Sequence, residues 1–149
     1  MLREWKAAEK PEEEELKKRL TAAREKLARQ QMLIKEKKVP VLVLMEGWGT
    51  AGKGSCIGEI IQNIDPRFFK VESMEKKSEE EERHPFLYRY FAKIPEAGKF
   101  VFLDSGWMGE TVGDYLRGEL KESEYTRRIE SIRRFERQLT DNGYLVMKF

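Results

Sequence analysis

Residues 39–55 read VPVLVLMEGWGTAGKGS, an apolar run followed directly by a glycine-rich loop that contains a lysine. The apolar part, residues 39–45, predicts a buried strand that enters the loop, and residues 57–64 predict the first turns of a helix that leaves it. Between them the loop has the spacing Gly-x-x-x-x-Gly-Lys, from Gly47 to Lys53. A strand, a loop of this spacing and a helix, in this order, predict an α/β fold with a phosphate-binding loop.

The glycines of this loop allow the backbone to curl, so that successive N–H groups point at phosphate oxygens, while the helix N-terminus adds partial positive charge. The usual pattern places Ser or Thr directly after the lysine as a magnesium ligand. This chain has Gly54 there and Ser55 one residue later, rotated by about 100°. A plain glycine turn is the alternative, but the strand context and the lysine favour phosphate binding. The residues expected to hold phosphate are Gly47, Gly49, Gly52, Lys53, Gly54 and Ser55.

The composition indicates one domain with a buried core, because the chain has 149 residues and 40% of them are hydrophobic. Its 29 basic and 27 acidic residues nearly cancel, which argues against nucleic acid as a general partner. The single cysteine, Cys56, excludes an internal disulfide framework and favours a reducing compartment. No apolar run approaches the roughly 20 residues that span a bilayer, and the N-terminus lacks a signal-peptide core. We therefore expect a cytoplasmic protein without a membrane partner.

Helical and extended patterns alternate along the chain. Helices are expected at residues 12–37, 79–94 and 122–140, and further strands at residues 69–74, 100–103 and 144–149. With the loop region they predict a P-loop kinase-like three-layer αβα sandwich with a mostly parallel sheet. Residues 1–38 would form an N-terminal helical extension and residues 39–149 the P-loop domain. The long charged helix either packs on its own domain, which we favour, or pairs with another chain in a homo-oligomer.

An apolar strand that ends in an acid is the second functional element. Residues 100–103 are Phe-Val-Phe-Leu, and Asp104 follows them. In a parallel sheet this carboxylate would lie beside the phosphate loop, where it can hold Mg²⁺ directly or through water. Asp also ends strands as a turn former or helix cap, which is the alternative. The sequence stops at its fourth strand, whereas a nucleotide-kinase-like sheet normally has a fifth, so we expect a sheet truncated at the C-terminus.

Residues 41–149 resemble the second polyphosphate kinase family, whose members move phosphoryl groups between inorganic polyphosphate and nucleotides. The motifs that carry the resemblance follow the family's order and spacing. They are Glu46-Gly47 through Lys53-Gly54, Asp65-Pro66-Arg67, Phe69-Lys70-Val71, Ser78-Glu79-Glu80-Glu81, Tyr88-Arg89-Tyr90, residues 94–98, Asp104 with Trp107, and Phe135-Glu136-Arg137. The Lys-Gly variant of the loop is typical of this family, so the resemblance accounts for Gly54.

The resemblance implies a role for several matching side chains. Lys53 would bind the phosphoryl group in transfer, Asp104 would hold Mg²⁺, and Arg89 matches an arginine that lies near the phosphates. Lys76 and Lys77 precede a segment that would frame the phosphate channel, with solvated surface charge as the alternative. The implied reaction is phosphoryl transfer between inorganic polyphosphate and AMP or ADP.

Two positions depart from the family's pattern. Active members usually carry Asp at the third residue of the loop, where this chain has Gly49, and Arg after the third strand, where it has Ser105. Losing one cation that stabilises transition-state charge can raise the barrier by several kcal/mol. Some members contain two fused copies of the domain, one of which can lose catalytic residues. The departures therefore indicate the N-terminal copy of such a tandem polyphosphate:AMP phosphotransferase, with impaired catalysis.

Two other classes of protein are compatible with these motifs. One is an ATP-dependent nucleoside monophosphate kinase built on the same loop. The other is a non-catalytic phosphate-binding or oligomerisation module, which would use residues 12–37 as its contact surface. A transfer assay with polyphosphate and then ATP as donor separates the two enzymes. Titration with polyphosphate separates either from a module that has no affinity for phosphate.

Overall fold

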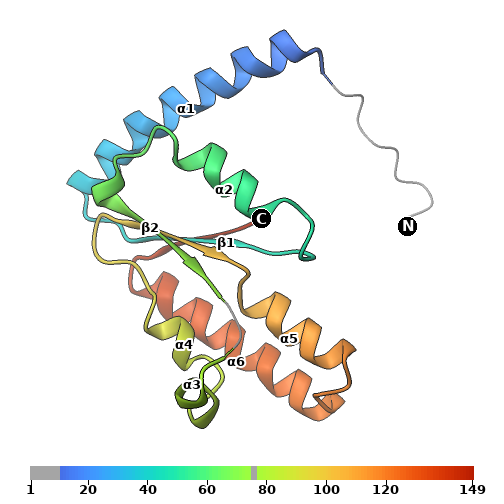
Figure 1. The fold of residues 1–149 in the computed structure, drawn as a ribbon. Helices are drawn as coiled ribbons and strands as arrows, with labels where there is room; N and C mark the ends of the chain where they lie inside the picture. Colours follow the sequence, from blue (N-terminus) through green and yellow to red (C-terminus); the bar gives the residue numbers. More distant parts are fainter. Residues whose placement is uncertain (1–10, 75–76) are drawn as a thin grey trace.

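In the residues that the structure describes, 11–74 and 77–149, a four-stranded parallel sheet forms the centre of the molecule (Figure 1). The structure is a computed structural model. Its strands are β1 (Val41–Met45), β2 (Phe69–Ser73), β3 (Phe100–Asp104) and β4 (Leu145–Lys148), in the spatial order β2-β3-β1-β4. Every neighbouring pair is parallel, as the sequence predicts.

Helices cover both faces of this sheet, which confirms the three-layer α/β sandwich. One layer holds α1 (Glu13–Glu36) and α2 (Lys53–Ile61) (Figure 1). The other holds α3 (Glu79–Arg83), α4 (Tyr88–Phe91), α5 (Trp107–Leu116) and α6 (Glu122–Asp141). In the part of the chain described, no helix is both long and apolar enough to cross a membrane.

β1 and β3 run through the middle of the sheet and end level with each other. Met45, the last residue of β1, is the register partner of Asp104, the last residue of β3. All of β1 is buried, because alternate residues face the two helical layers, and this explains an apolar run without polar alternation. Since the strands are parallel, their carboxyl ends share one edge, where open α/β sheets bind ligands.

Each face of the sheet has its own hydrophobic core. Toward α1 and α2, Val41 and Val43 of β1 pack with Ile57. Toward α5 and α6, Leu42 and Leu44 belong to a cluster rich in aromatic rings, whose other buried members are Tyr90, Val101, Leu103, Trp107, Ile132, Phe135 and Leu139. Trp107 is completely buried and contacts the rings of Tyr90 and Phe135 edge-on. These contacts fix the start of α5 directly below the carboxyl end of β3.

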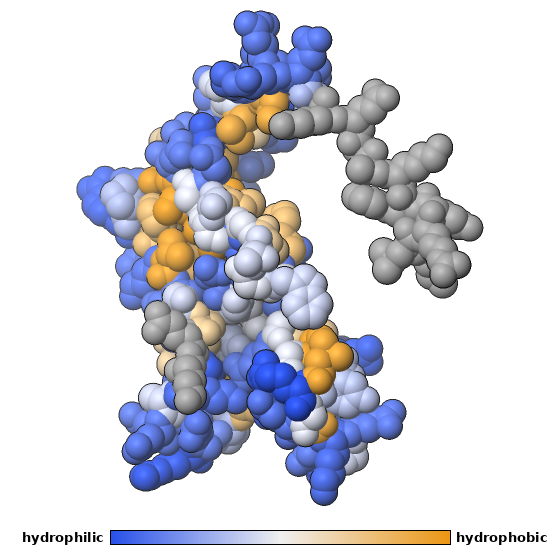
Figure 2. Space-filling view, turned by 45° about the vertical axis from the view of Figure 1, so that its right-hand side comes forward, coloured by the Kyte–Doolittle hydropathy of each residue, from blue (hydrophilic) through white to orange (hydrophobic). Residues whose placement is uncertain are grey.

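Only part of α1 packs on the sheet, so the expected packing on its own domain is confirmed for its second half. Leu27 and Ile34 contact the core, and buried Gln31 accepts a hydrogen bond from the backbone N–H of Asp65 at 3.3 Å. Leu16 and Leu20, in the first half, are exposed. On the face drawn in Figure 2, apolar residues lie in separate patches on a mainly hydrophilic surface. Pairing of α1 with another chain stays a prediction.

The prediction of one continuous helix at residues 79–94 is wrong. The segment forms two short helices, α3 and α4, with His84 and Pro85 between them, because a proline ring disfavours the helical conformation of the preceding residue. Ser78 caps α3 as predicted, through a reciprocal pair of hydrogen bonds with Glu81.

Two further helices differ from the expectation. α2 begins at Lys53 rather than at residue 57, so the helix starts inside the glycine loop. α5 was not predicted at all, since glycines at 106, 109 and 113 are poor helix formers. β4 borders the described sheet, and no described residue pairs with its outer edge. The fifth strand therefore stays a prediction.

Candidate phosphate-binding site

The loop between β1 and α2 depends on two glycines in conformations that other residues rarely adopt. Gly47, just after β1, has φ of +139°, and Gly52, the N-cap of α2, has φ of +81°. A hydrogen bond from the N–H of Ala51 to the carbonyl oxygen of Trp48, at 3.0 Å, closes the turn between them. The loop therefore curls back over the N-terminus of a nine-residue helix, where backbone N–H groups and the helix dipole favour an anion.

Lys53 folds back under this loop. Its side chain is only 9% exposed, and Nζ donates to the carbonyl oxygens of Gly47 at 3.2 Å and of Trp48 at 3.0 Å. The same Nζ lies 4.0 Å from Oδ1 of Asp104. The structure thus brings together the two residues that the sequence predicts as the core of the site, and the register of β1 and β3 explains why they meet.

A cavity of about 460 Å³ opens at this point. It is lined by Gly49, Thr50, Gly52, Lys53, Gly54, Ser55, Ser73, Met74, Asp104 and Ser105. We call it the loop cavity. Of the predicted phosphate-binding residues, only Gly47 is absent from this lining. A Cβ atom at Gly54 would lie 3.6 Å from Oδ2 of Asp104, so glycine at this position keeps the approach to the carboxylate open.

Asp104 is the acid that could hold a metal ion in the loop cavity. Its side chain is about one-third exposed, and the described residues contain no cluster of three or more metal-binding side chains. Mg²⁺ is commonly held by one or two carboxylates together with phosphate oxygens and water, so a single aspartate beside a phosphate cradle fits this ion. The donor set would be incomplete without a phosphate ligand.

Arg89 does not line the loop cavity. It is buried in α4 and lines a second cavity of about 520 Å³, which we call the α5 cavity. The two cavities share Met74 and Ser105 in their linings. The remaining residues around the α5 cavity are Gly47, Lys77, Glu82, Tyr90, Gly106, Gly109, Glu110, Asp114, Arg117 and Glu119. Lys76 lies outside the described residues.

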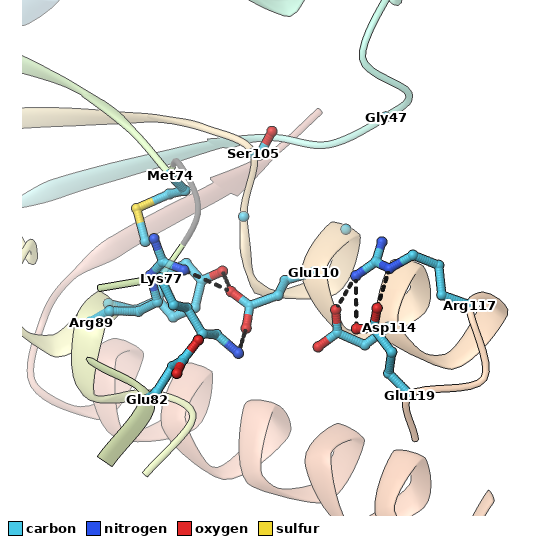
Figure 3. A pocket seen from close by; sticks show the side chains of 13 residues that line it. Gly47, Met74, Lys77, Glu82, Arg89, Ser105, Glu110, Asp114, Arg117 and Glu119 are labelled. Atoms are coloured by element: carbon cyan, nitrogen blue, oxygen red, sulfur yellow. Dashed lines mark hydrogen bonds and ion pairs between the residues drawn. The ribbon is translucent and has the colours of Figure 1, made fainter. Parts of the chain in front are cut away.

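Two acids of α5 pair with the cations of this second cavity (Figure 3), where Arg89 also pairs with Glu81 and Arg117 with Glu119. Glu110 lies 2.7 Å from Nζ of Lys77 and 3.6 Å from Nη1 of Arg89, and it accepts a hydrogen bond from the hydroxyl of Tyr90 at 2.8 Å. Burial and the adjacent carboxylate raise the pKa of Tyr90 above its ordinary value of 10.0. One turn later, Asp114 pairs with Arg117 at 2.5 Å and with Arg128 at 2.7 Å.

Sequence reasoning missed both acids because it missed α5. Their spacing of four residues was the available signal, since i and i+4 share one face of a helix. The match of Arg89 to a phosphate-binding arginine said nothing about Glu110, which is 21 residues away and reaches it only in the folded chain.

Glu46 connects the loop to α5. Its carboxylate accepts hydrogen bonds from the backbone N–H groups of Met108 at 3.2 Å and Gly109 at 2.8 Å, in the first turn of that helix. Burial raises the pKa of Glu46, although these hydrogen bonds oppose the shift. A Cβ atom at Gly109 would lie 2.8 Å from this carboxylate, and one at Gly106 would lie closer still. Glycine therefore fits at positions 106 and 109, because the Glu46 carboxylate lies where a side chain would begin.

The two positions that depart from the expected pattern leave space in the site. A Cβ atom at Gly49 would meet no atom within 4 Å, so a longer side chain would fit there. Ser105 adopts a left-handed conformation with φ of +78°, and its N–H donates to the carbonyl oxygen of Met45 at 3.1 Å. Its short side chain lies in the lining shared by the two cavities and brings no charge to either.

Comparison with known proteins gives consistent matches. A protein called polyphosphate:AMP phosphotransferase from Pseudomonas syringae pv. tomato is 33% identical over 109 residues, which are 73% of this chain and 22% of that protein. NDP-polyphosphate phosphotransferase 3 from Ruegeria pomeroyi is 32% identical over 83% of this chain and 41% of its own length. A crystal structure of polyphosphate kinase 2 from Arthrobacter aurescens superposes with a TM-score of 0.81 at 26% identity, covering 85% of this chain and 47% of that one.

The chain spans between about a fifth and a half of the length of these proteins. The family model described as Polyphosphate kinase 2 (PPK2) matches residues 10–149, which is nearly the whole chain. Together with the loop, Lys53 and Asp104 at the sheet edge, this match shows that the chain belongs to the polyphosphate kinase 2 family.

Proposed function

We propose that this domain is part of a phosphotransferase that moves phosphoryl groups between inorganic polyphosphate and AMP or ADP, with Mg²⁺ as cofactor. The observation that carries the proposal is the meeting of Lys53 and Asp104 at 4.0 Å in the lining of the loop cavity. Phosphoryl transfer requires mainly positioning and charge neutralisation, and these groups would provide both. The names of relatives, which include polyphosphate:AMP and ADP-polyphosphate phosphotransferases, support the choice of substrates.

Lys53 would bind the phosphoryl group through its ammonium. Its hydrogen bonds go to two neutral carbonyl oxygens, and the carboxylate of Asp104 lies 4.0 Å away, beyond hydrogen-bond distance. The loop also buries the amine, which strengthens its electrostatic interaction with a phosphate compared with an amine in water. The backbone N–H groups at the start of α2 would hold further phosphate oxygens.

Asp104 would hold Mg²⁺ at the edge of the sheet. When bound, the ion would neutralise charge on the phosphate oxygens that it contacts. The glycine at position 54 leaves the Asp104 carboxylate accessible to the ion, and the adjacent loop would keep the phosphate chain within its reach.

We propose that this copy of the domain transfers phosphate slowly. Gly49 and Ser105 bring no charged side chain to the loop cavity, and Arg89 lies in the α5 cavity against Glu110. In this proposal the chain is the N-terminal copy of a tandem cytoplasmic enzyme, and the exposed first half of α1 offers a surface for homo-oligomer formation.

The test is a transfer assay on the chain with Mg²⁺, AMP and polyphosphate, followed by the same assay with ATP as donor. We expect ADP to form from polyphosphate, and a Lys53→Met variant to form none. A Gly49→Asp, Ser105→Arg double variant should be at least about tenfold faster, because one added charge can lower a barrier by a few kcal/mol. A faster reaction with ATP would favour the nucleoside monophosphate kinase.

The second candidate is a module that binds phosphate without catalysis. The observation that favours it is the pairing of the α5-cavity cations with the acids of α5. Polyphosphate binding that depends on Lys53, without transfer by the chain or by the double variant, would support this candidate over the enzyme.

A further inference from the structure

The α5 cavity contains a group of side chains that could bind an oxyanion, and the carboxylate of Glu110 already lies among them. Three groups surround the carboxylate of Glu110: the ammonium of Lys77 at 2.7 Å, the guanidinium of Arg89 at 3.6 Å, and the hydroxyl of Tyr90, which donates a hydrogen bond at 2.8 Å (Figure 3). They come from the segment before α3 and from α4, whereas the carboxylate comes from α5. Two cations and a hydroxyl around one pair of oxygens are also the surroundings that bind a phosphate group.

This arrangement is buried enough for its charges to interact strongly. The exposed fraction of the side chain is 7% for Arg89 and 15% for Glu110. Lys77 and Tyr90 are also largely covered. Arg89 is shared with Glu81, which lies 3.5 Å from its Nε. In such surroundings solvent screens an ion pair weakly, so a further anion cannot approach Lys77 while Glu110 holds it without strong repulsion.

The α5 cavity lies where a phosphate chain would continue from the loop cavity. Met74 and Ser105 line both cavities, with Lys53 and Asp104 on one side and Lys77, Arg89 and Glu110 on the other. A chain of phosphates bound at Lys53, or the phosphate of a nucleotide that reacts with it, would therefore reach the donors around Glu110.

We propose that Glu110 masks a second phosphate subsite. Its carboxylate takes the place of a phosphate group against Lys77, Arg89 and Tyr90, and it sets the affinity of the chain for phosphate ligands by competing with them. The ligand is a phosphate oxyanion, either of polyphosphate or of a nucleoside monophosphate. The position of the subsite rests on the proposed function, because the loop cavity is what places a phosphate chain next to it.

The charge balance of the α5 cavity supports the masking. The lining holds three cations, Lys77, Arg89 and Arg117, and four acids, Glu82, Glu110, Asp114 and Glu119. With Glu110 ionised, the acids of this lining outnumber its cations by one, which disfavours a polyanion. Removing the charge of Glu110 releases Lys77, leaves Arg89 with one carboxylate fewer beside it, and keeps the hydroxyl of Tyr90 in position.

The test is calorimetric titration of the chain with tripolyphosphate and, separately, with AMP, in the presence of Mg²⁺. Glu110→Gln keeps the size of the side chain and removes its charge. We expect it to bind one of the two ligands at least about tenfold more tightly than the unmodified chain, the ratio expected when hydrogen bonds to charged groups become available. The ligand that gains affinity identifies the source of the phosphate.

Two matched variants separate the masking from a general effect of charge. Glu80→Gln removes one negative charge from the exposed surface of α3, outside the cavity lining, and should change the affinity by less than about twofold. Adding Lys77→Met to Glu110→Gln should abolish most of the gain, because it removes a donor of the subsite. A gain that survives this second substitution would overturn the proposal.

The outcomes distinguish this proposal from the proposed function. Unchanged affinity in Glu110→Gln, with Lys53-dependent binding retained, would overturn the masked subsite alone. Tighter binding in Glu110→Gln, with no dependence on Lys53 in the unmodified chain, would overturn the role of the loop alone. If thermal unfolding shows that Glu110→Gln does not fold, Glu110→Asp withdraws the carboxylate by one methylene. Affinity no higher than that of the unmodified chain would then overturn the masking.

Discussion

The loop cavity and the α5 cavity lie side by side, and each contains a buried cation, but the partners of these cations differ. In the loop cavity, Lys53 contacts two neutral carbonyl oxygens and lies 4.0 Å from its carboxylate. In the α5 cavity, Lys77 lies 2.7 Å from the carboxylate of Glu110. A phosphate can contact the first cation without displacing a carboxylate, whereas it must displace Glu110 from the second. The availability of a cation therefore depends on what already holds it.

The largest expected effect tests the difference between Lys53 and Lys77. Lys53→Met should weaken tripolyphosphate binding by about 100-fold, because it removes the one cation in the lining of the loop cavity, which no carboxylate holds by a hydrogen bond. Lys77→Met is the matched control and should change the affinity by less than about threefold, since Glu110 already holds that lysine. Calorimetric titration measures both. Equal losses in the two variants would mean that the cavities do not differ as described.

The next effect concerns the contact between the loop and α5. Gly106→Ala should lower the free energy of unfolding by about 2 kcal/mol, because the new methyl group overlaps the carboxylate of Glu46 and the side chain of Leu44. Gly58→Ala, in α2, meets no atom within 4 Å and should raise it by about 0.5–1 kcal/mol through helix propensity. Urea denaturation measures both. A stable Gly106→Ala variant would show that Glu46 does not hold α5.

A smaller effect tests the metal site of the loop cavity. Asp104→Asn should weaken tripolyphosphate binding about tenfold in Mg²⁺, because the neutral amide holds the ion poorly. In EDTA the same variant should bind at least as tightly as the unmodified chain, since a negative charge beside Lys53 has been removed. A tenfold loss in both conditions would indicate that Asp104 positions Lys53 and does not hold the ion.

The smallest effect is a pH dependence at Glu46. Its folded-state pKa is raised by burial, so its protonated form is favoured in the folded chain. The contribution of Glu46 to stability is therefore complete below its ordinary pKa of 4.5 and declines as the pH rises through the raised value. As the pH falls, the free energy of unfolding of the unmodified chain should therefore rise relative to that of Glu46→Gln. A difference that does not vary with pH would contradict this assignment.

The parts of the fold that follow from local chemistry were predictable from the sequence. The buried strand before Gly47, the capped start of α3 at Ser78 and the acid after β3 each depend on neighbours in the sequence. The positions of Lys53 and Asp104 followed from one rule, that parallel strands deliver their carboxyl ends to the same edge. For this reason the sequence alone places Lys53 and Asp104 close together, as the structure does.

The parts that depend on distant contacts were not predictable. Gly106 and Gly109 weaken the helical pattern of α5, and the reason for both is the carboxylate of Glu46, about 60 residues earlier. The role of Arg89 stays a prediction, and one of the two acids beside it, Glu110, lies on a helix that the sequence analysis did not predict. The break between α3 and α4, by contrast, could have been predicted from Pro85 alone.

The most direct test of the central claim is a crystal structure of the chain with tripolyphosphate and Mg²⁺. We expect phosphate density in the loop cavity, within hydrogen-bond distance of Lys53 and with the ion at Asp104, while Glu110 still holds Lys77. Phosphate density against Lys77 and Arg89, with the loop cavity empty, would contradict it.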